Sequence, residues 1–260
     1  MPKKYKLAAA FAGLAILLTA TVGASTSFAQ NLNGLEMSFT PYLWVAGPHA
    51  KIKTPLPNAK EVTANRDFSD VIGSLNGLPF MGSFEIRQGA FGFVGDLIHL
   101  PVGTNITTRN VFYNGGSADM TATTGTALFM YRPLADPVQF LDTGIGVRVW
   151  NFSSDLSFNG GLLAPASLSR SATWADPLIA VRYHRELGNG FGLTVYADAG
   201  GFGAGADIDW QLAGTIDYTP NTWLTLRGGY RAMSFNYQAN NNLGFDVQLR
   251  GPIIAATFRF

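Results

Sequence analysis

Apolar and polar residues alternate one by one over most of the chain from Leu35 to Phe260. A period of two is typical of a β-strand that presents unlike faces on its two sides. Thr, Val, Tyr, Phe and Gly dominate these segments, where a helix would favour Ala, Leu, Glu and Lys. We expect strands at residues 35–46, 78–88, 91–103, 118–132, 138–152, 173–187, 191–203, 208–218, 222–237 and 244–260.

The connections between these segments alternate in length. Tight turns are expected at residues 88–90, 133–137, 188–190 and 219–221, and mostly longer loops at 47–77, 104–117, 153–172 and 238–243. Short turns at one end, longer loops at the other and an even number of strands are typical of a bacterial outer-membrane barrel. We therefore predict an all-β fold, a transmembrane antiparallel up-and-down β-barrel of ten strands, with eight or twelve strands as the alternatives.

The N-terminus has the features of a secretory signal peptide. Lys3, Lys4 and Lys6 precede an apolar run over residues 7–22, and small residues at Ser27 and Ala29 mark a cleavage site. The run is shorter than the ~20 residues that a membrane-spanning helix needs. We predict that residues 1–29 are removed and that residues 30–260 form one barrel domain, exported to the bacterial outer membrane.

Charge and cysteine content exclude several classes of function. Without the three lysines of the leader, 15 of the 18 basic residues remain against 17 acidic ones, so nothing favours nucleic-acid binding. The chain has no cysteine, which excludes disulfides, thiolate metal sites and a cysteine nucleophile. Stability must come from packing and backbone hydrogen bonds.

Charged residues share one face of several predicted strands. Asp142 and Arg148 have one parity, whereas Ile145 and Val147 have the other. Polar inward and apolar outward is the pattern of a membrane barrel, and glycines of the polar parity would leave room for arginines. Arginine can pair with two carboxylates across a narrow barrel. We predict a lumen charge network of Glu85, Arg87, Asp96, Asp142, Arg148, Asp176, Arg182, Asp198, Asp209, Asp217, Arg227, Arg231, Asp246 and Arg250.

The last strand requires an additional assumption. Asp246, Gln248 and Arg250 have the polar parity there and Val247 and Leu249 the apolar one. A bulge at Pro252 would then shift the parity and return the C-terminal aromatics to the lipid face.

The aromatic residues favour a membrane barrel over a soluble secreted sandwich or lipocalin-like barrel, which would place its apolar parity inward. Aromatic residues gather near strand ends, as in the two girdles of a membrane barrel. Near the loop ends these are Trp44, Trp150, Trp174 and Trp210, and near the turn ends Tyr131, Phe140, Tyr218, Trp223 and Phe260.

The C-terminus resembles the signal by which outer-membrane barrels present their last strand to the bacterial assembly machinery. Its matching residues are Phe260, Phe258 and, more weakly, Ala256 and Ile254. Further blocks resemble a family of uncharacterised outer-membrane β-barrel proteins of Gram-negative bacteria. These are FTPYLW (39–44), FMGSFEIRQGAFGFVGDLIHL (80–100), WADPLIAVRYH (174–184), DAGGFGAGADIDWQ (198–211), GGYRAM (228–233) and GPIIAATFRF (251–260). The resemblance implies fold and location and supplies no catalytic residues.

No catalytic constellation is evident. His184 is expected near a turn and His99 on the face opposite Asp96, so neither assembles a nucleophile, a base and an orienting group. We expect no enzyme, no cofactor and no metal, with outer-membrane lipid and the assembly machinery as partners. The favoured function is a structural or narrow-pore barrel with a charge-paired lumen. The alternatives are a barrel whose surface loops bind a ligand or mediate adhesion, and an outer-membrane enzyme that modifies lipid or hydrolyses its substrate.

Overall fold

The computed structural model describes residues 34–53, 62–65, 70, 73–106, 113–238 and 244–260. The predicted signal peptide lies outside these residues. Among the described residues, no helix has the length and apolar character needed to cross a membrane. The strands are β1 (Leu35–Trp44), β2 (Gly47–Lys53), β3 (Val62–Asn65), β4 (Phe80–Gln88), β5 (Phe91–Ile106), β6 (Tyr113–Asp136), β7 (Gln139–Gly160), β8 (Ala166–Gly188), β9 (Phe191–Gly201), β10 (Ile208–Asn221), β11 (Leu224–Gln238) and β12 (Gly244–Arg259).

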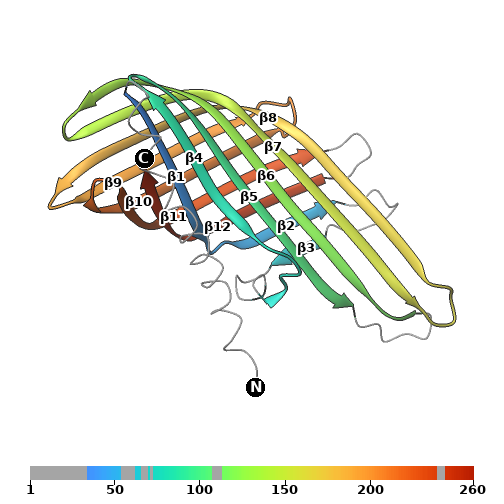
Figure 1. The fold of residues 1–260 in the computed structure, drawn as a ribbon. Coiled ribbons are helices and arrows are strands. Elements are labelled where there is room, and N and C mark those ends of the chain that lie inside the picture. The colour runs from blue at the N-terminus through green and yellow to red at the C-terminus, as the bar shows by residue number, and fades with distance from the viewer. Residues whose placement is uncertain (1–33, 54–61, 66–69, 71–72, 107–112, 239–243) are drawn as a thin grey trace.

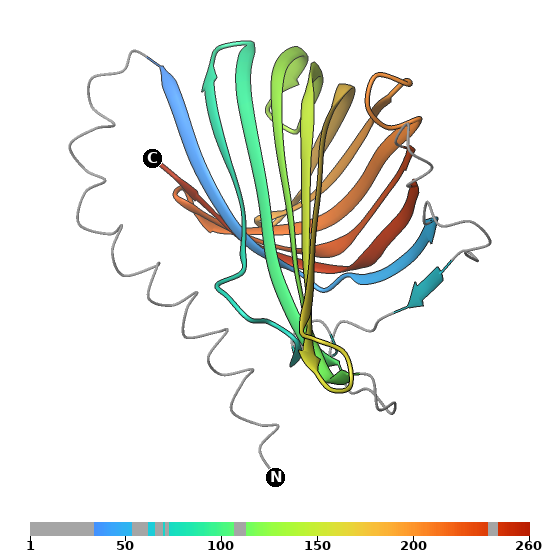
Figure 2. The ribbon, with the colours of Figure 1, turned by 90° about the vertical axis from the view of Figure 1, so that its right-hand side faces the viewer.

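Strand β1 closes the sheet into a barrel because it pairs antiparallel with both β4 and β12. Phe39 lies opposite Phe84 on one side and Phe258 on the other. The closure reaches the last residue, since the Phe260 amide donates to the Met37 carbonyl at 2.9 Å. Seen from the side in Figure 2, the wall runs from β1 through β4–β8 and returns through β9–β12. The fold is thus the predicted closed antiparallel barrel, with ten strands in its wall.

Tight turns connect the strands at one end, called here the turn end; the opposite end is the loop end. At the β8–β9 turn, Asn189 and Gly190 have φ values of 54° and 78°, as a type I′ hairpin turn requires. At the β6–β7 turn, the Val138 and Gln139 amides donate to the Asp136 carboxylate at 2.9 and 3.0 Å. These bonds lower the pKa of Asp136.

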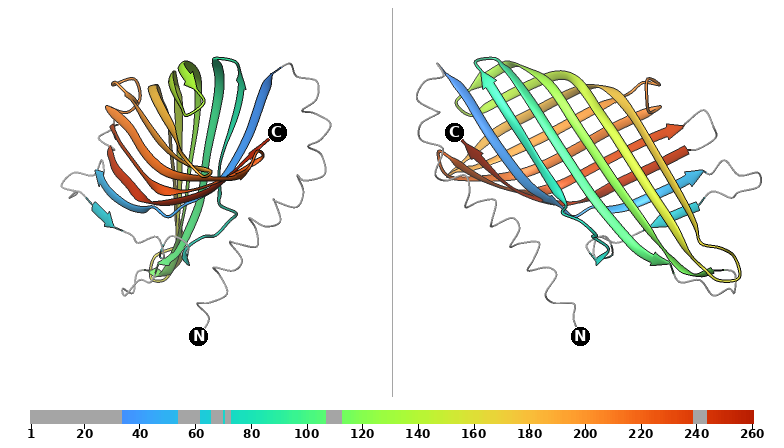
Figure 3. Two further views of the ribbon diagram at one scale, coloured as in Figure 1. Left: turned by 90° about the vertical axis from the view of Figure 1, so that its left-hand side faces the viewer. Right: turned by 45° about the vertical axis from the view of Figure 1, so that its right-hand side comes forward.

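Strands β6, β7 and β8 have 24, 22 and 23 residues and extend beyond the other strands at the loop end (Figure 1). Figure 3 shows β5–β8 projecting past the rest of the wall. These strands are longer than the sequence predicted, because residues 153–158 and 166–171, which were predicted as part of a loop, continue the β7–β8 ladder. Backbone pairing outweighs the weak strand preference of the individual residues.

Strands β2 and β3 form an addition to the wall that the sequence did not predict. β2 continues the line of β1 along β12 after a break at Val45 and Ala46, where the Val45 amide donates to the Pro252 carbonyl at 2.8 Å. β4 pairs with β1 only as far as Gly82 opposite Pro41. Figure 3 shows β2 and β3 diverging from β5 beyond that point.

Outward side chains of the turn half are apolar. Phe129 and Ile145, neighbours on β6 and β7, are 52% and 65% exposed, as expected of side chains that contact hydrocarbon. Outward positions become polar towards the loop end. There, one row of the β5–β8 sheet consists of His99, Thr123, Asn151 and Thr173. This row marks the border of the apolar belt towards the loop end, which we call the upper border.

Inward side chains change from polar to apolar towards the loop end. Charged residues line the interior of the turn half, whereas Trp150, Phe152 and Phe235 fill it nearer the loop end. Polar inward and apolar outward therefore holds only where the wall faces hydrocarbon. Above the belt the outer face meets water and headgroups, and the arrangement is that of a soluble barrel.

The prediction that Asp246 and Arg250 face the lumen is wrong. β11 and β12 keep one register from Gln238 opposite Gly244 to Leu224 opposite Phe258, so no bulge at Pro252 exchanges the faces. The physical reason is that residues 244–250 lie above the apolar belt, where polar side chains point outward. Their inward neighbours Val247 and Leu249 pack against the interior aromatic residues. Arg250 is exposed and donates to Gln248 Oε1 at 2.6 Å.

The prediction of an aromatic girdle at the loop end is also wrong in part. Trp44, Trp150 and Trp174 are buried inside the barrel, and only Trp210 of the four is outward, at 37% exposure. At the turn end, outward rings do gather in pairs that unite neighbouring strands. The distance between ring centres is 5.4 Å for Phe91 and Tyr131, 4.9 Å for Phe191 and Tyr218, and 6.2 Å for Trp223 and Phe258. Phe140, predicted with them, faces inward instead, over His184.

The lumen as candidate functional site

Three layers of side chains cross the lumen, one above the other along β7. We name the first the turn-side layer: Glu85, Arg87, Arg132, Asp142 and Arg182. Its centre is Asp142, which accepts hydrogen bonds from Arg132 Nε at 2.7 Å, Arg182 Nη2 at 2.6 Å and Arg87 Nη2 at 3.1 Å. Arg182 also forms a bidentate pair with Glu85 at 2.7 and 2.8 Å. Because β4 and β8 are not neighbours, this pair spans the interior.

Small residues and rings fit around this layer. A Cβ added at Gly92 would lie 2.9 Å from Arg87 Nη2, so this glycine leaves room for an arginine. Gly144 instead makes room for the Met130 side chain and for backbone. The Arg132 guanidinium lies 3.8 Å from the centre of the Phe140 ring, a cation–π contact.

Arg148 is the centre of the second layer, the middle layer, which comprises Tyr42, Asp96, Arg148, Tyr196, Asp198, Asp209, Gln211 and Arg231. Arg148 Nη1 donates to Asp209 at 2.6 Å and Nη2 to Asp198 at 2.7 Å. Arg148 is 1% exposed and Asp209 fully buried. Burying such a pair costs least when its remaining atoms are also bonded. Arg148 Nε donates to Thr126, and Tyr196 donates to the same Asp198 oxygen as Arg148, whereas Asp198 Oδ1 is buried without a hydrogen-bond partner among the described residues.

Arg231 occupies the other side of the middle layer. It donates to Gln211 Oε1 at 2.8 Å, to Tyr42 Oη at 2.9 Å and to Asp96 Oδ1 at 3.2 Å. Tyr42 in turn donates to Asp96 at 2.8 Å. These contacts unite β11 with β10, β1 and β5 across the lumen.

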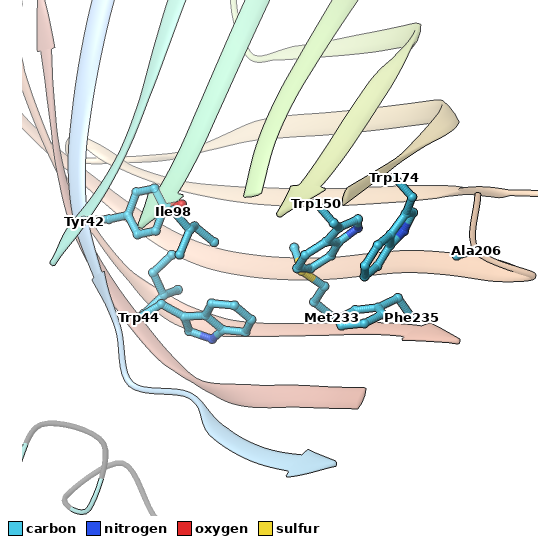
Figure 4. Packing of buried hydrophobic residues seen from close by; sticks show 9 residues of the cluster. Tyr42, Trp44, Ile98, Trp150, Trp174, Ala206, Met233 and Phe235 are labelled. Atoms are coloured by element: carbon cyan, nitrogen blue, oxygen red, sulfur yellow. The ribbon is translucent and has the colours of Figure 1, made fainter. Parts of the chain in front are cut away.

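The third layer, the aromatic cap, lies in the interior on the loop-end side of the charges: Trp44, Trp150, Trp174, Met233 and Phe235 (Figure 4). The Trp150 and Phe235 ring centres are 4.3 Å apart. The cap also makes polar contacts with the charged residues. Trp150 Nε1 donates to Asp209 at 2.9 Å, and Trp174 Nε1 donates to Asp176 at 3.0 Å.

The remaining predicted lumen residues lie around these layers. Asp176 is fully buried and accepts the Ala206 amide at 2.6 Å. Asp217 is 3.9 Å from Arg227 Nε and accepts the Thr194 hydroxyl at 2.6 Å. His184 approaches Thr194 through Nδ1 at 2.9 Å. All but Asp246 and Arg250 of the predicted network therefore point inward.

Sequence reasoning missed several members of the layers, namely Tyr42, Arg132, Tyr196 and Gln211. Arg132 has the parity of Thr126 on β6, a signal that could have placed it inside. Tyr42 has the parity of Trp44, which was predicted in the loop-end girdle. The predicted assembly residues Ile254, Ala256, Phe258 and Phe260 lie on the outward parity of β12.

Within the described ranges, no group of three or more His, Cys, Asp and Glu side chains is arranged to hold a metal ion. The chemistry of the lumen is that of mutually neutralised charges. The ion pairs Arg87–Asp142, Arg182–Glu85, Arg148–Asp198 and Arg148–Asp209 join acids and bases of this chain to one another.

No protein-family profile matches the chain, and no curated protein matches it. In fold, the chain is similar to the outer membrane protease OmpT from Escherichia coli, with a TM-score of 0.58 and 9% identity over 88% of this chain and 97% of that one. Solved structures that also match include the translocator domain of the autotransporter NalP from Neisseria meningitidis (TM-score 0.42, 13% identity, 97% of both chains). Another is the attachment invasion locus protein Ail of Yersinia pestis (TM-score 0.36, 12% identity, 88% and 100%).

The closed wall, the outward apolar belt and the similarity to OmpT define the class by fold. The chain has the fold of an integral outer-membrane β-barrel protein. At these identities the similarity concerns the fold and carries over none of the neighbours' activities.

Proposed function

We propose that this protein is a structural barrel whose lumen is closed to ions and solutes. The observation that carries the proposal is the burial of charge inside a membrane barrel. Asp142, Asp176 and Asp209 have no exposed surface, although a water-filled pore would leave lumen carboxylates hydrated. The turn-side layer, the middle layer and the aromatic cap close the lumen in series.

Leakage of potassium ions from proteoliposomes tests this proposal. Vesicles with the folded protein should retain potassium as well as empty vesicles, whereas vesicles with an open 16-stranded porin should lose it rapidly. Leakage comparable to that of the porin would contradict a closed lumen. Folding is checked in the same vesicles by the heat-dependent position of the protein on gels.

A second candidate function is recognition at the cell surface, favoured by the projection of β6–β8 beyond the wall. Replacing residues 154–170 by Asn-Gly would shorten the β7–β8 hairpin in register, because Ser153 lies opposite Ser171. If the projection binds a surface ligand, cells with the shortened hairpin should lose binding to a glycan array. Unchanged binding would exclude this role for the hairpin.

The proposed function includes no catalysis. The Thr194 hydroxyl donates a hydrogen bond to Asp217, and His184 Nε2 contacts Glu186 at 3.1 Å, which supports the absence of an activated nucleophile from this proposal. His99 Nδ1 lies 2.9 Å from the Thr123 hydroxyl on the outward face. Hydrolysis of lipid A or of a peptide by the wild-type protein, lost in His184→Gln, would contradict this proposal.

Export and assembly belong to the same proposal. Residues 1–29 direct export, the assembly machinery inserts the chain through its last strand, and outer-membrane lipid surrounds it without a cofactor. Processing is tested by N-terminal sequencing, which should place the mature terminus near Gln30. An uncleaved leader would contradict this part.

A further inference from the structure

A groove of about 430 Å³ runs over the outward face of the wall. The groove is formed by two rows of outward residues that extend across the wall to β7, the lower row from β1 and the upper row from β4. The lower row is Phe39, Phe84, Gly95, Ala127 and Val147, and the upper row Gly82, Leu97, Gly125 and Val149. The small residues form the floor, and aromatic rings and valines form the two sides. Its volume lies within the roughly 300–1,000 Å³ typical of sites for small ligands.

The groove has a defined top and bottom. Below it, the next outward row presents only large apolar side chains, among them Phe93, Phe129 and Ile145. Above it lies the polar row that contains His99, Thr123 and Asn151. The groove is therefore an apolar recess at the upper edge of the belt, towards the loop end.

Neither packing nor backbone conformation requires two of the glycines of the floor, Gly95 and Gly125. A Cβ added at Gly95 or Gly125 would meet no atom within 4 Å, and neither residue has a positive φ. The inward glycines differ, because a Cβ at Gly146 or Gly229 would collide with backbone of the neighbouring strand. Space over Gly82 is already closed by the Phe80 and Phe39 rings. The open space lies over β5 and β6.

We propose that this groove holds an acyl chain of lipid A, the multi-chain glycolipid of the outer leaflet. The groove is continuous with the lipid-facing surface, and an empty recess there would leave its lining atoms without contact partners. Between apolar groups in a bilayer, van der Waals packing rather than the hydrophobic effect determines which contacts persist. A chain in the groove touches wall atoms on three sides, whereas a chain elsewhere on the belt touches them on one.

The leaflet follows from orientation. The longer loops of outer-membrane barrels face the cell exterior. The groove lies directly below the polar row on the loop-end side, which corresponds to the outer leaflet. The hydroxyl and amide groups of that row lie at the level of the lipid headgroup.

Lipid retention by the purified, folded barrel tests the inference. Native mass spectrometry would compare the wild type with Gly95→Leu/Gly125→Leu after incubation with lipid A or with phosphatidylethanolamine. The matched control is Gly228→Leu, an outward glycine of β11 that also has no atom within 4 Å of an added Cβ but lies outside the groove. We expect the lipid A adduct in the wild type and in Gly228→Leu, and its loss in the double variant.

Two results would overturn the inference. Equal lipid A retention by all three proteins would show that the groove holds no chain. A groove-dependent adduct of phosphatidylethanolamine with none of lipid A would show that the occupant is wrong. If the leucines prevent folding, Gly95→Ala/Gly125→Ala is measured instead, because it extends only methyl groups into the groove. Its lipid A retention should be lower than that of the wild type and of Gly228→Leu, but above zero.

Discussion

Arg148 on β7 donates a hydrogen bond of 2.6 Å to Asp209 on β10, across the interior of the barrel. The same carboxylate accepts the Trp150 indole of the aromatic cap at 2.9 Å. One buried carboxylate thereby joins the middle layer to the cap. The charge network and the aromatic cap are therefore one packed unit, which supports the proposal of a closed lumen.

Removing the arginine should therefore destabilise the barrel strongly. Arg148→Ala leaves Asp198 and Asp209 buried without their cation, a change that costs about 3–5 kcal/mol for buried pairs. Urea unfolding in lipid vesicles measures the free energy of unfolding. A loss below about 1 kcal/mol, the upper range of exposed pairs, would show that water reaches this site.

A neutral replacement is the matched control. Arg148→Met/Asp198→Asn/Asp209→Asn removes all three charges together, and replacing a buried network by neutral groups is often tolerated. We expect this triple variant to unfold at higher urea than Arg148→Ala. The reverse order would mean that side-chain volume, not unpaired charge, explains the single variant.

The cap should depend on its indole donors as well as on its rings. Trp174→Phe keeps a ring beside Tyr237, whose centre is 4.0 Å from that of Trp174, but removes the donor to Asp176. The loss of a partner from a buried polar group costs about 1–3 kcal/mol. Trp223→Phe, at an exposed girdle position, should change the unfolding free energy little. Equal effects of both variants would contradict a role for the buried bond.

The change of faces along β12 predicts opposite responses at two outward positions. Ile254→Arg places a charge in the apolar belt and should cost up to about 2–4 kcal/mol near the midplane, less towards the interface. Gln248 lies above the belt, beside the exposed Arg250, so Gln248→Arg should cost much less folding free energy. Folding yield in lipid vesicles decides between them. Equal yields would place both residues outside the hydrocarbon.

Much of the fold could be predicted because the alternation of residues is a local signal. All ten wall strands have more than half of their length in the predicted segments, and closure through Phe260 follows from the C-terminal alternation. The serine-rich ends of β7 and β8 could not be predicted. Their ladder depends on the partner strand and not on strand preference.

The candidate site shows a second limit of sequence reasoning. The parity of Asp142 and Ile145 shows that they lie on opposite faces of the strand, but it does not show which face points into the barrel. That depends on height in the membrane, which is why Asp246 and Arg250 were assigned to the lumen and Trp150 to a girdle. Partners such as Arg182 and Glu85, on strands that are not neighbours, become evident only when the barrel is closed.

The last residue gives a prediction about assembly. Deleting Phe260 removes the amide that donates to Met37 and the terminal aromatic ring, so insertion should slow while export continues. Pulse–chase labelling with heat-dependent gel mobility measures the rate at which folded barrel appears. Replacing Arg259, which points inward to Thr225, by Lys is the control and should leave that rate unchanged. Normal insertion without Phe260 would contradict the assignment.

Single-channel recording in planar bilayers tests the closed lumen most directly. The wild-type barrel should give no current steps, because the turn-side layer, the middle layer and the aromatic cap lie in series. A variant that opens all three, Arg182→Ala/Arg148→Ala/Trp150→Ala, should give steps if it folds, and each layer restored singly should reduce them. Steady porin-sized currents through the wild-type protein would contradict the account.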